Sequence, residues 1–84
     1  MEIAVEISLY PLHQQYIAPI QDFIDRLNAD GRLRVVTNDM STQVFGEYDD
    51  VMQRLVRELR GTFATNDKAV FVMKVLGPRG QPAA

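Results

Sequence analysis

Hydrophobic and polar residues alternate along the first ten positions of the chain. Ile3, Val5, Ile7 and Leu9 are apolar, and they alternate with Glu, Ala and Ser residues. A period of two is typical of a β-strand with one buried face. Pro11 lacks a backbone N–H, so we expect it to end this strand.

A different period governs residues 16–29, where apolar residues recur every three or four positions. The residues of this stripe are Ile17, Ile20, Phe23, Ile24 and Leu27. Their spacing predicts an amphipathic helix. Pro19 suits its first turn, where a missing N–H costs little, and Gly31 is placed for a left-handed C-terminal cap.

The segments 32–38 and 41–47 return to the strand pattern. Asn38-Asp39 between them predicts a turn, so the two segments are expected to form a hairpin. In the second strand Val44 is expected to face the core.

A second helix is predicted after this hairpin, followed by a strand over residues 68–76. Apolar residues spaced by four mark its inner face: Val51, Leu55 and Leu59. Asp49 or Asp50 would open the helix, because acidic residues suit its positive N-terminal end. Gly61 would follow its last turn.

The resulting β-α-β-β-α-β order predicts an α+β fold of the ferredoxin-like type. This fold is a two-layer sandwich with a four-stranded antiparallel sheet and two helices on one face. Residues 1–76 would form this single domain. Residues 77–84, with the sequence GPRGQPAA, are expected to be a disordered tail.

Two helices cover only one side of such a sheet, so the strand phases predict what the open face carries. Its expected apolar residues are Tyr10, Val36, Phe45, Val70, Val72 and Leu76. Phe71, Met73 and Val75 would face the helices. An open patch of this size is unusual on a monomer, so we expect a homodimer or homotetramer assembled through the open face.

Composition narrows the class of protein. The chain has 84 residues, a net charge of −2 and no cysteine, with 46% hydrophobic and 24% charged residues. This is an ordinary globular composition. The sequence has no basic stripe of the kind that nucleic-acid-binding domains carry. It has no cysteine thiolates to bind a metal and no apolar run long enough to span a membrane. We expect a cytoplasmic protein with no cofactor, nucleic acid or membrane partner.

The ionisable side chains offer few candidates for catalysis. His13 is the only histidine, and without a positioned acid or nucleophile it makes no catalytic triad. The helical carboxylates are interpreted as solvated partners for Arg26 and Arg54 at helical spacing. They are Asp22, Asp25, Asp49, Asp50 and Glu58. Glu47 is expected at a strand end or helix cap.

Glu6 is different because it lies in the middle of a strand, on the face expected to be covered. Two interpretations stay open. It could form a cross-strand pair with Lys74, or its carboxylate could bind a cationic or amino-heterocyclic ligand.

Two segments of the sequence resemble a known family. Residues 7–12 and 16–20 read ISLYPL and YIAPI, and residues 40–52 contain MST, V, GE and DVM at the corresponding places. Together they are similar to the thiamine-binding (YkoF-like) family, over residues 2–76. The resemblance implies a domain that binds thiamine or its hydroxymethylpyrimidine part in vitamin uptake or salvage, without catalysis. Asn38-Asp39 and Phe45 depart from the family pattern.

The chemistry of an aminopyrimidine then suggests which side chains near these positions would bind the ligand. The candidate ligand-binding residues are Glu6, Ser8, Tyr10, Ser41, Thr42 and Phe45. The hydroxyls would bond the polar ring edge, an aromatic ring would stack on it, and the carboxylate would meet an amino group. Ser41 and Thr42 equally suit local backbone bonds, and Tyr10 equally suits a dimer contact. Met40 is expected in the core.

Two other classes of function remain open from the residues alone. One is a dimeric ferredoxin-like enzyme that acts on a small aromatic substrate, with His13 as its acid or base. The other is a structural assembly domain whose open face only joins copies of the chain.

Overall fold

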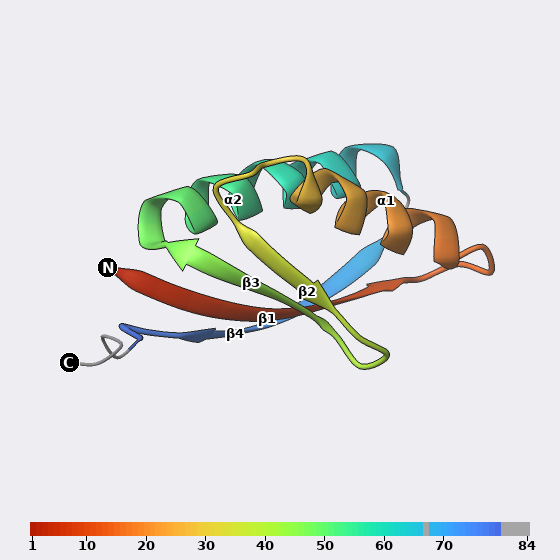
Figure 1. The fold of residues 1–84 in the computed structure, drawn as a ribbon. Coiled ribbons are helices and arrows are strands. Elements are labelled where there is room, and N and C mark those ends of the chain that lie inside the picture. The colour runs from red at the N-terminus through yellow and green to blue at the C-terminus, as the bar shows by residue number, and fades with distance from the viewer. Residues whose placement is uncertain (67, 80–84) are drawn as a thin grey trace.

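The structure, a computed structural model, describes residues 1–66 and 68–79 of the chain. Its elements are β1 (Glu2–Pro11), α1 (Ile17–Asn28), β2 (Arg34–Thr37), β3 (Thr42–Glu47), α2 (Tyr48–Thr65) and β4 (Ala69–Leu76). The strands form one antiparallel sheet in the order β2-β3-β1-β4. Both helices lie on the same side of this sheet (Figure 1). The predicted ferredoxin-like sandwich is confirmed.

The core lies between the sheet and the helices, where the sequence periods place it. Val5 in β1 and Val44 in β3 pair directly, and both are fully buried. Leu27 of α1 and Val51 of α2 are equally buried in the same apolar cluster. The apolar residues that alternate along the strands and those that recur along the helices therefore pack into one core.

The open face is apolar as predicted. Tyr10, Val70, Val72 and Leu76 are exposed, and their pairing in β1 and β4 puts them on the side away from the helices. Val36 of β2 is also exposed.

The helix-facing side of β4 departs from the prediction. Met73 and Val75 were expected in the core, but their exposed fractions are 41% and 53%. They pair with the buried Ile7 and Val5, so their phase is as expected. They remain exposed because the two helices do not cover this edge of the sheet.

Two predicted helix ends are wrong. No described glycine has a positive φ, so Gly31 is not a left-handed cap. α1 ends at Asn28, and its C-cap is Ala29, whose N–H donates to the Arg26 carbonyl. Gly61 does not end α2, which continues to Thr65. A Cβ at Gly61 would lie 2.7 Å from Nη1 of Arg26. Glycine stands there because the Arg26 guanidinium passes against the helix backbone.

The chain after β4 stays beside the N-terminal strand as far as it is described. The Arg79 N–H donates to the Glu2 carbonyl, at 2.8 Å. The rest of the segment expected to be a disordered tail, residues 80–84, lies outside the described residues.

Candidate functional site

An open pocket of about 590 Å³ lies at one end of the sheet, beside α1. Its volume falls in the range of small-molecule sites. Three parts of the chain form its walls: residues 7–12 of β1 and the turn after it, residues 37–42 of the β2–β3 hairpin, and α1 with Tyr16 before it. The lining is mainly apolar and aromatic, with several hydroxyl and amide groups among it.

The pocket exists because β3 is shorter than β1. Pairing between these strands stops at Ile7 and Thr42, whereas β1 remains paired with β4 as far as Pro11. The β1 backbone after Ile7 therefore has a free edge on its β3 side, and this edge faces the pocket.

The strand register decides which backbone groups lie on this free edge. The N–H of Leu12 donates to the carbonyl of Lys68, so even-numbered β1 residues bond to β4. Odd-numbered residues direct their N–H and C=O the other way. Leu9 thus presents one donor and one acceptor to the pocket, and the described residues provide neither with a hydrogen-bond partner. Pro11 has no N–H, so the donor–acceptor pair is not repeated along the edge.

The hairpin turn forms the opposite wall. The Oδ1 of Asn38 accepts the backbone N–H groups of Met40 and Ser41, at 2.8 and 3.0 Å. This side-chain bonding confirms the predicted turn. Met40 was expected in the core, but 85% of its surface is exposed. It lies in the tight turn that leads into β3, so the core layer of the hairpin begins only at Thr42.

The third wall of the pocket is α1, and part of the apolar stripe along this helix lines the pocket. Leu27 is buried in the core, Phe23 is buried but also reaches the pocket, and Ile20 and Ile24 are half-buried and line it. Tyr16, directly before α1, is 53% exposed and also lines it. The apolar stripe of this helix serves both the core and the pocket.

The structure brings four of the six predicted site residues to this pocket. Ser8, Tyr10, Ser41 and Thr42 line it. Thr42 lies on the helix side of the sheet, 6% exposed, within hydrogen-bond distance of the Thr37 hydroxyl.

Glu6 lies one step away from the pocket. Its Oε2 accepts a hydrogen bond from the Ser41 hydroxyl, at 3.1 Å, and its Oε1 lies 3.8 Å from Nζ of Lys74. The cross-strand pair that the sequence left open is present, at the outer limit of an ion pair. Glu6 can therefore position Ser41 without lining the pocket itself.

Phe45 lies apart from the other five. It pairs with Ala4, near the opposite end of the sheet, and does not line the pocket. The guanidinium groups of Arg34 and Arg79 lie 4.0 and 4.8 Å from its ring centre. This ring already stacks with two cations, so it does not contribute the aromatic wall that was expected of it.

Several contributors to the pocket were not among the predicted site residues, among them Tyr16, Ile20, Ile24, Asp39 and the Leu9 backbone. Tyr16 stands in the second quoted segment of the family resemblance, which was the available signal. The Leu9 backbone could not be found without the register, because it depends on where β3 begins.

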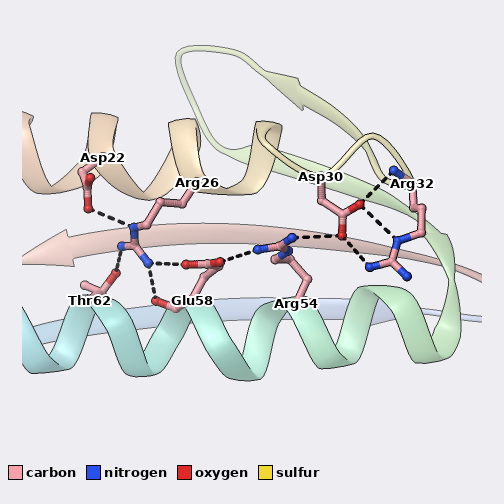
Figure 2. A network of polar contacts seen from close by, with 7 residues as sticks. All are labelled: Asp22, Arg26, Asp30, Arg32, Arg54, Glu58 and Thr62. Atoms are coloured by element: carbon pink, nitrogen blue, oxygen red, sulfur yellow. Dashed lines mark hydrogen bonds and ion pairs between the residues drawn. The ribbon is translucent and has the colours of Figure 1, made fainter.

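The titratable groups with shifted pKa values lie elsewhere, mainly between the two helices (Figure 2). A chain of ion pairs and hydrogen bonds there connects Asp22, Arg26, Glu58, Arg54, Asp30 and Arg32. The helical pairs Asp22–Arg26 and Arg54–Glu58 are as predicted. Glu58 is not solvated, however: it is 5% exposed and bridges Arg26 and Arg54.

Burial alone would raise the pKa of Glu58, but hydrogen bonds from Arg54 and Arg26 outweigh it and hold the pKa below its usual value. The pKa of Asp30 is held well below its usual range by the side chain and backbone N–H of Arg32 and by Arg54. Glu47 directly precedes α2, as expected, and its carboxylate pairs with the N-terminal amine at 2.6 Å. These groups are satisfied, which indicates a structural role.

His13 lies in the loop after β1, exposed, and does not line the pocket. Over residues 1–66 and 68–79, no group of three or more His, Cys, Asp or Glu side chains could hold a metal ion. No helix in the described part of the chain is long and apolar enough to cross a membrane.

Solved structures with the same fold support the architecture. A protein from Streptococcus pneumoniae matches with a TM-score of 0.86 and 23% identity, over 94% of this chain and 89% of that one. A proposed thiamine biosynthesis/salvage protein from Thermotoga maritima matches with a TM-score of 0.80 and 18% identity, over 89% and 82% of the two chains. At these identities the likeness shows the fold alone. No curated protein matches the sequence.

The family of the chain is shown by a match to a family model, whereas the solved structures show only its fold. The model of the YkoF-related family matches residues 2–74, which include all three walls of the pocket. The expected resemblance is thereby confirmed, and the chain belongs to the YkoF-related family.

Proposed function

We propose that this chain binds thiamine, or the hydroxymethylpyrimidine part of it, in the pocket beside α1. The role is binding in vitamin uptake or salvage within the cytoplasm, rather than catalysis. Membership of the YkoF-related family and the fold shared with the Thermotoga maritima protein support this proposal.

The observation that carries the proposal is the unpaired donor–acceptor pair of Leu9 at the pocket wall. An aminopyrimidine has an amino N–H donor directly beside a ring-nitrogen acceptor. The amino group can donate to the C=O of one extended residue while the ring nitrogen accepts from its N–H. A residue of a neighbouring strand would pair with the same two groups. An unpaired N–H and an unpaired C=O in a partly apolar pocket favour a ligand that forms hydrogen bonds with both of them.

The rest of the pocket suits the remaining parts of such a ligand. Tyr10 and Tyr16 offer aromatic surface for a flat ring, and Ile20 and Ile24 offer apolar contact. Asp39 is one of the lining residues, and its negative charge would favour the positively charged thiazolium ring.

We propose further that the protein works as a homo-oligomer whose open face is covered by another copy. The exposed Val70, Val72 and Leu76 on that face support this assembly. Tyr10 belongs both to this face and to the pocket lining, so a second copy would help to close the site.

Calorimetric titration with thiamine, hydroxymethylpyrimidine and oxythiamine tests the proposal. In oxythiamine an oxo group replaces the amino group, which reverses the donor and acceptor of the ring edge. We expect thiamine and hydroxymethylpyrimidine to bind, and oxythiamine to bind at least about fivefold more weakly, because a mismatched buried pair costs about 1–3 kcal/mol. No heat and no thermal shift with thiamine or hydroxymethylpyrimidine would refute the proposed ligand.

Two tyrosine variants locate the site. Tyr16→Ala removes an aromatic wall and should weaken thiamine binding several-fold. Tyr48→Ala is the matched control, because Tyr48 is also exposed but does not line the pocket. Equal effects of the two substitutions would place the ligand elsewhere.

A further inference from the structure

Phe45 is the centre of a cluster of side chains on the open face of the sheet, away from the pocket. It faces this side because Val44, the residue before it, is buried in the core. Arg34 of β2 is paired directly opposite Phe45, and its guanidinium carbon lies 4.0 Å from the ring centre. The guanidinium carbon of Arg79 lies 4.8 Å from the same centre. One aromatic ring therefore gathers two positive charges from distant segments of the chain.

The backbone before Arg79 is tied to β1, which fixes where this arginine lies. The Arg79 N–H donates to the Glu2 carbonyl at 2.8 Å. Two residues earlier, a Cβ at Gly77 would lie 2.6 Å from Cγ2 of Ile3, so the chain passes too close to β1 for a side chain at this position. Because the segment is held at both points, its contact with Phe45 is a built feature of the fold.

The two guanidinium groups have no counter-charge in the described part of the chain. Two carboxylates of the same face are engaged elsewhere: Glu6 lies 3.8 Å from Nζ of Lys74, and Glu47 pairs with the N-terminal amine. Over residues 1–66 and 68–79, no carboxylate oxygen lies within 4.0 Å of a side-chain nitrogen of Arg34 or Arg79. The cluster is thus strongly positive within a chain whose net charge is −2.

A guanidinium held over an aromatic ring is well prepared to bind an anion. The ring contacts the flat face of the guanidinium, and the N–H donors along its edge remain free. Its plane is already restricted, so less side-chain freedom is lost when those donors bind a ligand. The arrangement of these donors matches two oxygens of a phosphate or a carboxylate.

We propose that Arg34, Arg79 and Phe45 form a binding site for a phosphate group, either free or as the monoester of a small molecule. A phosphate monoester carries a charge of about −1.5 to −2 at pH 7, which two guanidinium groups would balance. A carboxylate carries a single charge and would leave one of them uncompensated. Ala4 and Leu76 follow Phe45 in the same row across the sheet, and they offer apolar surface for the organic part of a monoester.

This site is separate from the pocket beside α1 and does not depend on the proposed ligand. The lining of that pocket contains none of the three residues, and it contains no lysine, arginine or histidine. A phosphate group therefore has charged partners at Phe45 and none in the pocket. Where a second copy covers the open face, bound phosphate would also neutralise two charges that would otherwise be buried without compensation.

Titration of the full chain with sodium phosphate, followed by NMR spectroscopy, tests the proposal. The signals to follow are the side-chain Nε–H groups of Arg34 and Arg79 and the ring protons of Phe45. We expect these signals to shift and to saturate over the millimolar range of phosphate. The ionic strength is held constant, because salt alone screens exposed charges. Sodium acetate, as the single-charge control, should bind at least about fivefold more weakly.

Substitution of single arginines locates the bound phosphate. Arg79→Ala should weaken phosphate binding at least about fivefold, measured on the Arg34 and Phe45 signals. Arg60→Ala is the matched control, because it removes the same charge from an exposed position on α2, and it should leave the affinity unchanged. Shifts that rise without saturating, equal affinity for acetate, or equal losses in the two variants would overturn the proposal.

Discussion

At the scale of single residues, the interface between the helices depends on Glu58. This carboxylate is buried and accepts hydrogen bonds from Arg26 at 2.5 Å and from Arg54 at 2.7 Å. Removing one member of a buried ionic group leaves the others without compensation, which costs more than the pair itself contributes. Glu58 is therefore the residue of the network whose loss should matter most.

We expect Glu58→Gln to lower the free energy of unfolding by about 3 kcal/mol. Asp22→Asn is the matched control, because Asp22 pairs with the same arginine from a side chain that is 62% exposed. It should cost no more than about 0.5 kcal/mol. Urea unfolding of both variants measures the difference, and similar losses for the two would show that burial of Glu58 is unimportant.

The same network predicts how stability depends on pH. The pKa values of Asp30 and Glu58 are both lower in the folded protein than in the unfolded chain, where they lie near 4. A group with a lowered folded pKa contributes stability that is present above its unfolded pKa and is lost as the pH falls toward its folded pKa.

We therefore expect stability to be nearly constant from about pH 7 to 5 and to fall below about pH 4. Asp30→Asn should reduce the slope of this acid loss, because it removes one of the titrating carboxylates. Urea midpoints at pH 7, 5, 4 and 3 measure the effect. A variant whose acid slope equals that of the unchanged chain would exclude Asp30 as a source of the pH dependence.

At the scale of elements, the sequence predicts the order and phase of strands and helices better than their ends. Period-two alternation set Val5 and Val44 on the core face correctly. Gly61 was misread as a helix end because a glycine required for close packing looks the same in one sequence as a glycine required for a cap. What decides between them is Arg26, 35 residues away.

This reading of Gly61 makes a prediction with an unusual sign. Alanine normally stabilises a helix interior by about 1 kcal/mol relative to glycine. Here the new Cβ would displace the Arg26 guanidinium from Glu58 and Thr62. We expect Gly61→Ala to destabilise the unchanged chain but to stabilise an Arg26→Ala background. A thermal-unfolding double-mutant cycle measures this, and equal shifts in both backgrounds would contradict it.

The candidate site was predictable only in part, for a related reason. Ser8, Tyr10 and Ser41 were found because the family resemblance marks positions along the chain. Phe45 was assigned from chemistry alone, and nothing in a single sequence reveals that Arg34 and Arg79 stack on its ring. The Leu9 contribution comes from the backbone and is independent of side-chain identity.

At the scale of the whole molecule, the fold exposes three surfaces to which other molecules could bind. The helices bury one face of the sheet, the open face and the β4 edge are apolar and exposed, and the pocket lies where β3 is shorter than β1. Ligand and second copy are proposed for different surfaces that share Tyr10. Binding and assembly are therefore expected to be coupled, so that thiamine should shift the equilibrium toward the larger species at low protein concentration.

The central claim is that the free backbone edge of β1 recognises an aminopyrimidine, and amide NMR spectroscopy tests it most directly. On adding thiamine, the Leu9 N–H should show one of the largest chemical-shift changes and become protected from hydrogen exchange. The amides of Phe45 and its neighbours in β3 should change little. Thiamine-induced shifts centred on Phe45, with the Leu9 amide unchanged, would contradict the account.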